Sequence, residues 1–292
     1  MFELIRAGEC SYYIDCPAKM GLYQASDSEV YLIDSGNDKD AGRKVRQILD
    51  RNGWKLLGIL VTHSNADHIG GCQYLQKQTG CRIFAAGIEA AFTRYPVLEP
   101  AFLYGGFPPK PLRHKFMMAQ PSPAVDLNSE GFPAELEVLP LPGHFFDMVG
   151  FRTPDDVVYL ADCLSSRETL DKYQIGFIYD VAAYLDTLER VKSLRARMFV
   201  PAHAPASEEI AQLAQDNIDK VWEIAGRILS LCGEPRSFEE VLRRLFADYQ
   251  LTMDFQQYVL VGSTIRSYLA YLLDQGRLSA EFSDCRLLWR RA

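Results

Sequence analysis

The chain has 292 residues, of which 48% are hydrophobic and 24% charged, and its formal net charge is −7. This composition is typical of a folded globular protein of one or two domains, and it excludes collagen-like and disordered architectures. The sequence contains no run of about 20 apolar residues and no secretory signal pattern, so we expect a cytoplasmic protein without a membrane partner. The acidic charge disfavours a nucleic acid partner, because such partners are bound largely through Lys and Arg.

The cysteines also bear on the location of the protein. Seven cysteines are present, an odd number, and none of them forms a C-x-x-C pair. This pattern predicts neither a zinc ribbon nor a complete disulfide framework. Reduced and mostly buried thiols in a cytosolic protein are the expected state.

The first two thirds of the chain alternate short apolar strands with helices. Apolar, β-branched or aromatic runs predict strands, the last of them unbroken, over 2–5, 11–14, 21–25, 30–33 and 56–62. Helical periodicity and strand-like runs follow in turn, with helices over 39–51 and 71–77 and strands over 82–85, 135–139, 157–160 and 198–200. Sheets covered by helices are implied, so the predicted class is an α/β layered domain.

Residues 87–133 interrupt this alternation with a long segment rich in proline and aromatic side chains. A segment of this kind covers a functional cleft or contacts a partner, or it forms a surface arm packed on the core. We predict a lid-like insertion. Its basic residues Lys110, Arg113, His114 and Lys115 would bind a carboxylate or phosphate on a small molecule, or would form a solvated loop face.

From residue 207 onward the pattern becomes helical. Helices are predicted over 208–231, 237–248 and 255–273, followed by a hairpin over 279–282 and 286–289. This order is that of a winged helix. The segment carries more acidic than basic residues, however, and helix 255–273 contains Arg266 as its only cation. We therefore expect the tail to pack or to dimerise rather than to read DNA.

Histidine is scarce, and its positions give the strongest functional signal. Five histidines are present, and His114 lies outside any strand-end context, so we leave it out of the predicted site. The other four follow predicted buried strands together with two aspartates, the full set being His63, Asp67, His68, His144, Asp162 and His203. Imidazole and carboxylate are the ligands that zinc and related ions use in catalytic sites.

The order and spacing of these residues resemble the metallo-β-lactamase superfamily of metal-dependent hydrolases. The first motif of that family is H-x-H-x-D-H, followed by a histidine after Pro-Gly, an aspartate after a buried strand and a late histidine. The six residues above match these positions over about residues 1–205. The resemblance implies an αββα sandwich over 1–206 and a winged-helix-like domain over 207–292. It also implies that Asp34 supports a ligand rather than binding metal.

One position departs from the family pattern, because Asn65 stands where the motif has its second histidine. The resemblance implies two metal positions, bridged by Asp162: a first from His63, Asn65 and His144, and a second from Asp67, His68 and His203. An amide oxygen is a weaker and harder donor to zinc than imidazole, so the first position should lose affinity or select a more oxygen-preferring metal. Three alternatives stay open: two metals with Asn65 as a weak or absent ligand, one metal held mainly at the second position, or a metal-poor relative.

The sequence therefore predicts a metal-dependent hydrolase in which metal-activated water attacks a small ester, thioester or lactone-like substrate. Asp67 is the expected catalytic residue, which orients this water and accepts a proton. Zinc is the expected ion, with iron or manganese as alternatives, and no nucleotide fingerprint indicates a further cofactor. The alternatives are a phosphodiesterase or ribonuclease of the same superfamily and a non-catalytic binding protein with a degenerate metal site. A small-molecule substrate is the expected partner, and a homodimer is left open.

Overall fold

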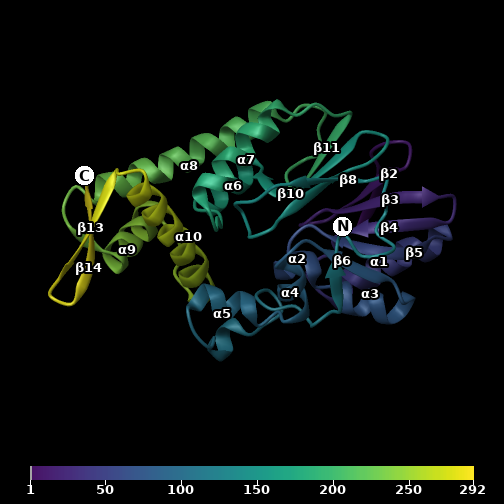
Figure 1. Ribbon diagram of the computed structural model, residues 1–292, viewed down its shortest axis with the longest axis horizontal. Coiled ribbons are helices and arrows are strands. Elements are labelled where there is room, and N and C mark those ends of the chain that lie inside the picture. The colour runs from purple at the N-terminus through teal and green to yellow at the C-terminus, as the bar shows by residue number, and fades with distance from the viewer. Residues whose placement is uncertain (1) are drawn as a thin grey trace.

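The computed structural model describes residues 2–292 and contains two facing β-sheets (Figure 1). The first sheet has seven strands in chain order, antiparallel from β1 to β4 and parallel from β4 to β7. Its strands are β1 (Glu3–Arg6), β2 (Ser11–Asp15), β3 (Met20–Ser26), β4 (Glu29–Ile33), β5 (Lys55–Val61), β6 (Arg82–Ala85) and β7 (Ala124–Asp126). The predicted antiparallel meander and the buried strand that follows it are confirmed.

The second sheet has four strands in the order β11-β10-β9-β8. Only β10 and β11 run parallel, while β8, β9 and β10 pair antiparallel. The bounds are β8 (Glu137–Pro140), β9 (Val149–Arg152), β10 (Val157–Ser165) and β11 (Met198–His203).

Helices cover the outer faces of both sheets. Alternation along β4 shows the principle: Leu32 packs beneath α1 and α3, whereas its neighbours Tyr31 and Ile33 face the second sheet. On the far side, α7 and α8 (Ala211–Leu231) cover the second sheet in a separate apolar cluster. The bounds of the helices up to this point are α1 (Lys39–Asn52), α2 (Ala66–Ile69), α3 (Cys72–Thr79), α4 (Glu89–Arg94), α5 (Leu98–Tyr104), η1 (Lys110–Leu112), α6 (Arg167–Tyr173) and α7 (Val181–Ser193). The predicted α/β class is confirmed, in four layers.

Helix α7 is absent from the predicted elements, although its sequence carries a helical signal. Asp180 caps its first turn by accepting a hydrogen bond from the Ala183 amide, and Val181, Tyr184 and Leu188 repeat along one buried face. The short helices α4 and α5 lie in the 87–133 segment, where prolines and their small size mask any periodicity.

The C-terminal segment adds three helices and a small antiparallel sheet in the order β12-β14-β13. Its elements are α8 (Ala211–Leu231), β12 (Arg236–Ser237), α9 (Phe238–Asp248), α10 (Phe255–Asp274), β13 (Leu278–Ser283) and β14 (Arg286–Arg291). The three predicted helices are confirmed, although α8 begins three residues later than the predicted start at 208.

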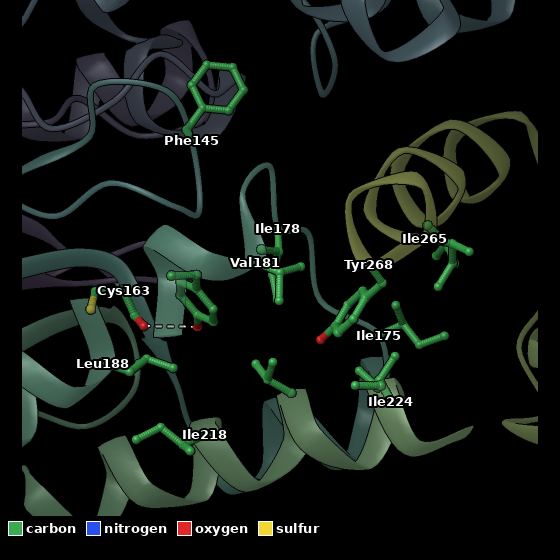
Figure 2. Close-up of a cluster of buried hydrophobic side chains, with 14 of the residues drawn as sticks. Phe145, Cys163, Ile175, Ile178, Val181, Leu188, Ile218, Ile224, Ile265 and Tyr268 are labelled. Carbon is green, nitrogen blue, oxygen red and sulfur yellow. Dashed lines mark hydrogen bonds between the residues drawn. The ribbon is translucent and has the colours of Figure 1, made fainter. Parts of the chain in front are cut away.

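The tail was predicted to pack or to dimerise, and the structure shows that it packs on the rest of the chain. Figure 2 shows Tyr268 of α10 turned toward α8, beside Ile175 and Ile224 in one buried cluster. In Figure 1, α5 lies against one end of α10, and this contact buries Leu103 with Val259. The 87–133 segment therefore connects the sheet domain to the tail.

Two further expectations concern membrane-spanning helices and disulfide bonds. Within residues 2–292, no helix combines the length and apolar character needed to cross a bilayer. All seven cysteines are free thiols.

Candidate metal centre

Four of the predicted site residues follow β5: His63 and Asn65 in the loop after the strand, and Asp67 and His68 in α2. β5 is a buried central strand whose carboxyl end opens at the edge of the sheet, where a rigid scaffold presents functional groups. The loop turns into α2, and Gly70 ends that helix against a neighbouring loop. A Cβ atom on Gly70 would lie 2.2 Å from the carbonyl carbon of Asn37, so only glycine permits this packing.

His144 and His203 reach the same place from the second sheet. His203 is the last residue of β11, and His144 follows β8 after a Pro-Gly turn. Gly143 has a φ of +121°, and a Cβ atom there would lie 2.3 Å from the backbone nitrogen of Tyr184. The glycine of the Pro-Gly-His pattern is therefore fixed by its close approach to α7.

Asp162 corrects the expectation that each later ligand follows the end of a strand. β10 continues to Ser165, so Asp162 lies inside the strand. The preceding Ala161 has a φ of +49°, and the register with β11 shifts on both sides of it. A bulge of this kind redirects a side chain, and here it accompanies an aspartate that faces the histidines.

Asp162 joins two groups of ligand-type atoms, and within each group all atoms lie within 4.8 Å of one another. We name the second position after Asp67, His68 and His203. There His68 Nε2 lies 2.9 Å from Asp162 Oδ1 and His203 Nε2 lies 3.1 Å from Asp162 Oδ2, while Asp67 Oδ2 lies 3.6 Å from His203 Nε2.

The first position consists of His63, Asn65 and His144 beside the same aspartate. Nε2 of His63 and of His144 lie 3.9 and 3.6 Å from Asp162 Oδ2, and Asn65 Oδ1 lies 3.2 Å from His144 Nε2. Tetrahedral donors at ordinary metal distances stand about 3.4 Å apart. Both positions therefore have the spacing of a metal ligand set.

Three of the imidazoles are oriented through Nδ1. Asp34 Oδ2 accepts from His68 Nδ1 at 2.8 Å and from Thr62 Oγ1 at 2.7 Å, and Thr62 Oγ1 in turn lies 3.1 Å from His63 Nδ1. His203 Nδ1 lies 3.0 Å from the Pro17 carbonyl oxygen. These contacts fix the tautomer and leave each Nε2 facing the centre, and they place Asp34 in the supporting role that the resemblance implies.

The second position is strongly polarised. Asp162 is the main cause that raises the pKa of His203 to about 10, against the effect of burial. Burial alone would lower the pKa of His68, but the carboxylates of Asp162, Asp67 and Asp34 raise it well above its usual value. Burial likewise opposes ionisation of Asp162, yet His203 and His68 hold its pKa well below the ordinary range. At the second position, the carboxylates and the protonated imidazoles therefore stabilise one another.

At the first position the pKa values of the histidines are lowered rather than raised. Burial lowers the pKa of His63 well below its usual value, and the neighbouring His68 lowers it further. Burial also lowers the pKa of His144. Neutral imidazole is the form that binds metal, so these two side chains are ready ligands.

The residues present fit a divalent cation. Within residues 2–292, His63 Nε2 is buried without a hydrogen bond partner, and the buried His68 Nε2 and Asp162 Oδ1 have no partner beyond their own 2.9 Å contact. Leaving such atoms unpaired is costly unless another group satisfies them. Imidazole nitrogens with carboxylate oxygens are a donor set for zinc, iron and manganese.

A pocket of about 460 Å³ opens above the centre. Asp67, His144, Asp162 and His203 lie in its wall. Its other side chains come from distant parts of the chain and are mainly apolar, aromatic or amide in character, among them Phe116, Phe177, Gln256, Gln257, Leu260 and Val261. Helix α10 therefore forms part of the wall.

Comparison with known proteins agrees with this arrangement. The sequence profile described as the metallo-beta-lactamase superfamily matches residues 14–203, which include every residue of both positions. The chain belongs to the metallo-beta-lactamase superfamily.

Curated relatives within this superfamily carry the name hydroxyacylglutathione hydrolase. The protein of Nitrobacter winogradskyi is 28% identical over 138 residues, which cover 44% of this chain and 42% of the relative. That of Shewanella pealeana is 28% identical over 142 residues, which cover 49% of this chain and 44% of the relative. The chain thus spans less than half the length of these relatives.

Solved structures of the superfamily show that the fold extends along nearly the whole chain. A metallo-beta-lactamase family protein of Thermus thermophilus aligns with a TM-score of 0.72 at 20% identity, over 97% of this chain and 99% of its own. A beta-lactamase domain protein of Burkholderia ambifaria aligns with a TM-score of 0.73 at 18% identity, over 99% and 94%. The likeness therefore includes the C-terminal helices.

Two buried glutamates in this superfamily member were not predicted as site residues. Glu89 accepts hydrogen bonds from the amide and hydroxyl of Ser64 and from the Asp147 amide, and burial raises its pKa to about 7. Glu99 accepts a hydrogen bond from Asn65. Both come from the 87–133 segment. In the sequence each is a single acidic residue among apolar neighbours, and this pattern does not indicate which residue it contacts.

The basic residues of the 87–133 segment lie apart from both positions. Lys115 pairs with Asp38 at 2.8 Å, and the Arg113 guanidinium lies over the ring of Phe107. His114 belongs to neither ligand group.

Proposed function

We propose that the chain is a metal-dependent hydrolase that cleaves a small thioester or a related ester or lactone. The observation that carries the proposal is the sharing of Asp162 by two groups of ligand atoms in the wall of one pocket. The name of the curated relatives, which denotes hydrolysis of an acyl group from glutathione, supports a thioester among these substrates.

The proposed metal ligands are the seven predicted residues, with zinc as the first ion to test and iron or manganese as alternatives. They are His63, Asn65 and His144 at the first position, Asp67, His68 and His203 at the second, and Asp162 between them. A divalent metal held by such ligands lowers the pKa of water to about 7 and polarises a carbonyl oxygen.

Asp67 is the proposed catalytic residue. Its side chain is 42% exposed, whereas that of Asp162 is 10% exposed, so the Asp67 carboxylate is the more accessible of the two in the pocket wall. Burial opposes its ionisation, but His68 and His203 hold its pKa below the usual range. In addition to its proposed role as a ligand, the ionised and accessible Asp67 carboxylate would orient attacking water and accept its proton.

The pocket wall favours a small acyl substrate over nucleic acid. Among the described residues that line it there is no Lys or Arg, and Phe177 and Leu260 offer apolar surface. Phosphodiester substrates of nucleic acid require cations along their path. A phosphodiesterase or ribonuclease is therefore the second candidate within the superfamily.

The domain arrangement that supports this activity has a hydrolase domain over 1–206, with 87–133 as a lid-like insertion, and a winged-helix-like domain over 207–292. The order of α8, β12, α9, α10 and the β13–β14 hairpin supports the second assignment. Helix α10 serves as a pocket wall in this arrangement, in place of a DNA-reading helix.

The test is metal analysis of the purified protein followed by turnover assays. We expect one or two equivalents of metal and hydrolysis of thioesters that a chelator abolishes and added metal restores. Phosphodiester or RNA cleavage in place of thioester hydrolysis would favour the second candidate. Protein that takes up no metal, or that takes it up without turnover of any substrate, would support the alternative of a non-catalytic binding protein.

A further inference from the structure

Asn65 lies at the start of a helix, where an asparagine side chain commonly caps the helix, but it does not do so here. It precedes α2 as the N-cap residue, and asparagine there commonly accepts a hydrogen bond from the first turn of the helix. No such bond is present. Instead, Nδ2 donates to Glu99 Oε1 at 2.7 Å, and Oδ1 faces His144 Nε2 at 3.2 Å.

Glu99 contacts the nitrogen end of the Asn65 amide. An amide has one donor end and one acceptor end, and the Glu99 carboxyl, whose pKa burial raises well above its usual value, accepts the hydrogen bond of Nδ2 through Oε1. The nitrogen of Asn65 therefore turns toward Glu99 and the oxygen toward His144.

The position of Glu99 in the fold suits this task. It lies on α5 and is 5% exposed, so water does not compete for the contact. The same helix is anchored on the tail, where Leu103 is buried with Val259 of α10. The acceptor is therefore held by packing that does not depend on the motif loop.

We propose that Glu99 is a positioning residue that aims the Asn65 oxygen into the first metal position, which thereby becomes a mixed imidazole and oxygen site. Such a donor set favours manganese or iron(II) relative to zinc, compared with the three-histidine set of the family motif. This inference rests on the proposed metal-dependent function, because it concerns the ligands of the same centre.

The test is titration of the full metal-free chain with Zn²⁺ and with Mn²⁺ by calorimetry, with Mn²⁺ also followed by electron paramagnetic resonance. We expect two binding steps in the wild type, the weaker at the first position. Glu99→Leu should weaken the weaker step about 10- to 100-fold and leave the tighter step within about twofold. Glu99→Gln, which still offers an acceptor to Asn65, should stay within about threefold of the wild type at both steps.

Two further variants separate aiming from general support. In an Asn65→Ala background, Glu99→Leu should have no additional effect on the weaker step, because the amide that it orients is gone. Asn65→His should raise the zinc affinity of that step more than its manganese affinity. Should Glu99→Leu fail to fold, Glu99→Asp withdraws the acceptor by one methylene and should weaken the first step about threefold to tenfold.

Several outcomes would overturn the inference. One is a wild type that binds two ions and a Glu99→Leu protein that binds both equally well. Another is equal weakening of both steps, which would assign Glu99 a merely structural role. A wild type that binds no metal would instead contradict the proposed function, so the two failures are distinguishable.

Discussion

The two metal positions share Asp162 but differ in how the metal-free chain holds their imidazoles. At the second position, carboxylates surround His68 and His203 and raise the pKa of both. At the first position, burial lowers the pKa of His63 and of His144, and the fourth side chain is a neutral amide. The carboxylates of the second position therefore stabilise positive charge, whereas His63, Asn65 and His144 of the first position are neutral donors.

This difference teaches that the substitution of one motif histidine by Asn65 is accommodated locally. The side chains of Asp67, His68 and His203 make no hydrogen bond to the side chain of Asn65, whose partners are Glu99 and His144. The carboxylates that attract a cation lie mainly around the second position. We therefore expect the second position to bind the tighter ion and the first to respond most to changes in the 87–133 segment.

Removing Asp162, which both positions share, should impair metal binding at both of them. Asp162→Ala takes one donor from each position and leaves four imidazoles without their common carboxylate. We expect metal uptake at both positions to fall and turnover to drop more than about a hundredfold, measured by metal analysis and steady-state kinetics. The matched control is Asp186→Ala on the exposed face of α7, which should retain both. Full metal content in Asp162→Ala would refute the bridging role.

Removing one histidine from each position should separate the two binding steps. His203→Gln should eliminate the tighter step of a zinc titration, whereas His144→Gln should eliminate only the weaker step and leave the tighter one within about threefold. The reason is that each histidine lies in one ligand group only. Identical titration curves for the two variants would mean that the chain binds a single ion between the positions.

The pH dependence of metal binding should also differ between the positions. The pKa of His203 is raised to about 10 and that of His68 is also raised, so both carry protons near neutral pH in the metal-free chain. Metal binds deprotonated imidazole, so zinc affinity at the second position should fall as pH falls, by up to about tenfold per pH unit for each proton. Calorimetry in buffers of different ionisation enthalpy counts the released protons.

The first position should release almost no protons above pH 7, because the pKa values of its histidines are lowered. The same raised pKa affects stability. Protonated His203 should stabilise the metal-free fold fully below about pH 6.5, and this stabilisation should disappear as pH rises through about 10. Melting temperatures with chelator present measure it, and His203→Gln should flatten the profile. Equal proton release at both steps would contradict the assignment.

The smallest effect should come from the pocket wall, which both positions share. Leu260→Ala on α10 removes apolar surface from the pocket without touching a ligand. We expect KM to rise about fivefold to tenfold with both metal-binding steps unchanged. Leu273→Ala on the same helix lies outside the pocket wall and should leave KM unchanged. A wild-type KM in Leu260→Ala would place the substrate elsewhere.

Much of the fold was predictable because its elements are local. The first six strands of the first sheet follow from short apolar runs, whereas β7 and β9 were not predicted; α9 and α10 follow from helical periodicity within one or two residues of their ends. The histidines and aspartates that cluster in the structure were predictable because histidine is rare and recurs near buried strands. Asp162 was also predicted, but its place inside β10 was not, since the irregular pairing with β11 around Ala161 is a tertiary contact.

The sequence by itself determined most of the strands and helices, the superfamily motif and the departure at Asn65. Tertiary structure alone decided how that departure is used. Glu99 lies 34 residues from Asn65 and His144 lies 79 residues away, and no local pattern links them. The pocket likewise needs α10, which reaches the centre from the far end of the chain. Such contacts arise because independent elements pack around one core, and a periodic pattern indicates which face of an element is buried without naming what it meets.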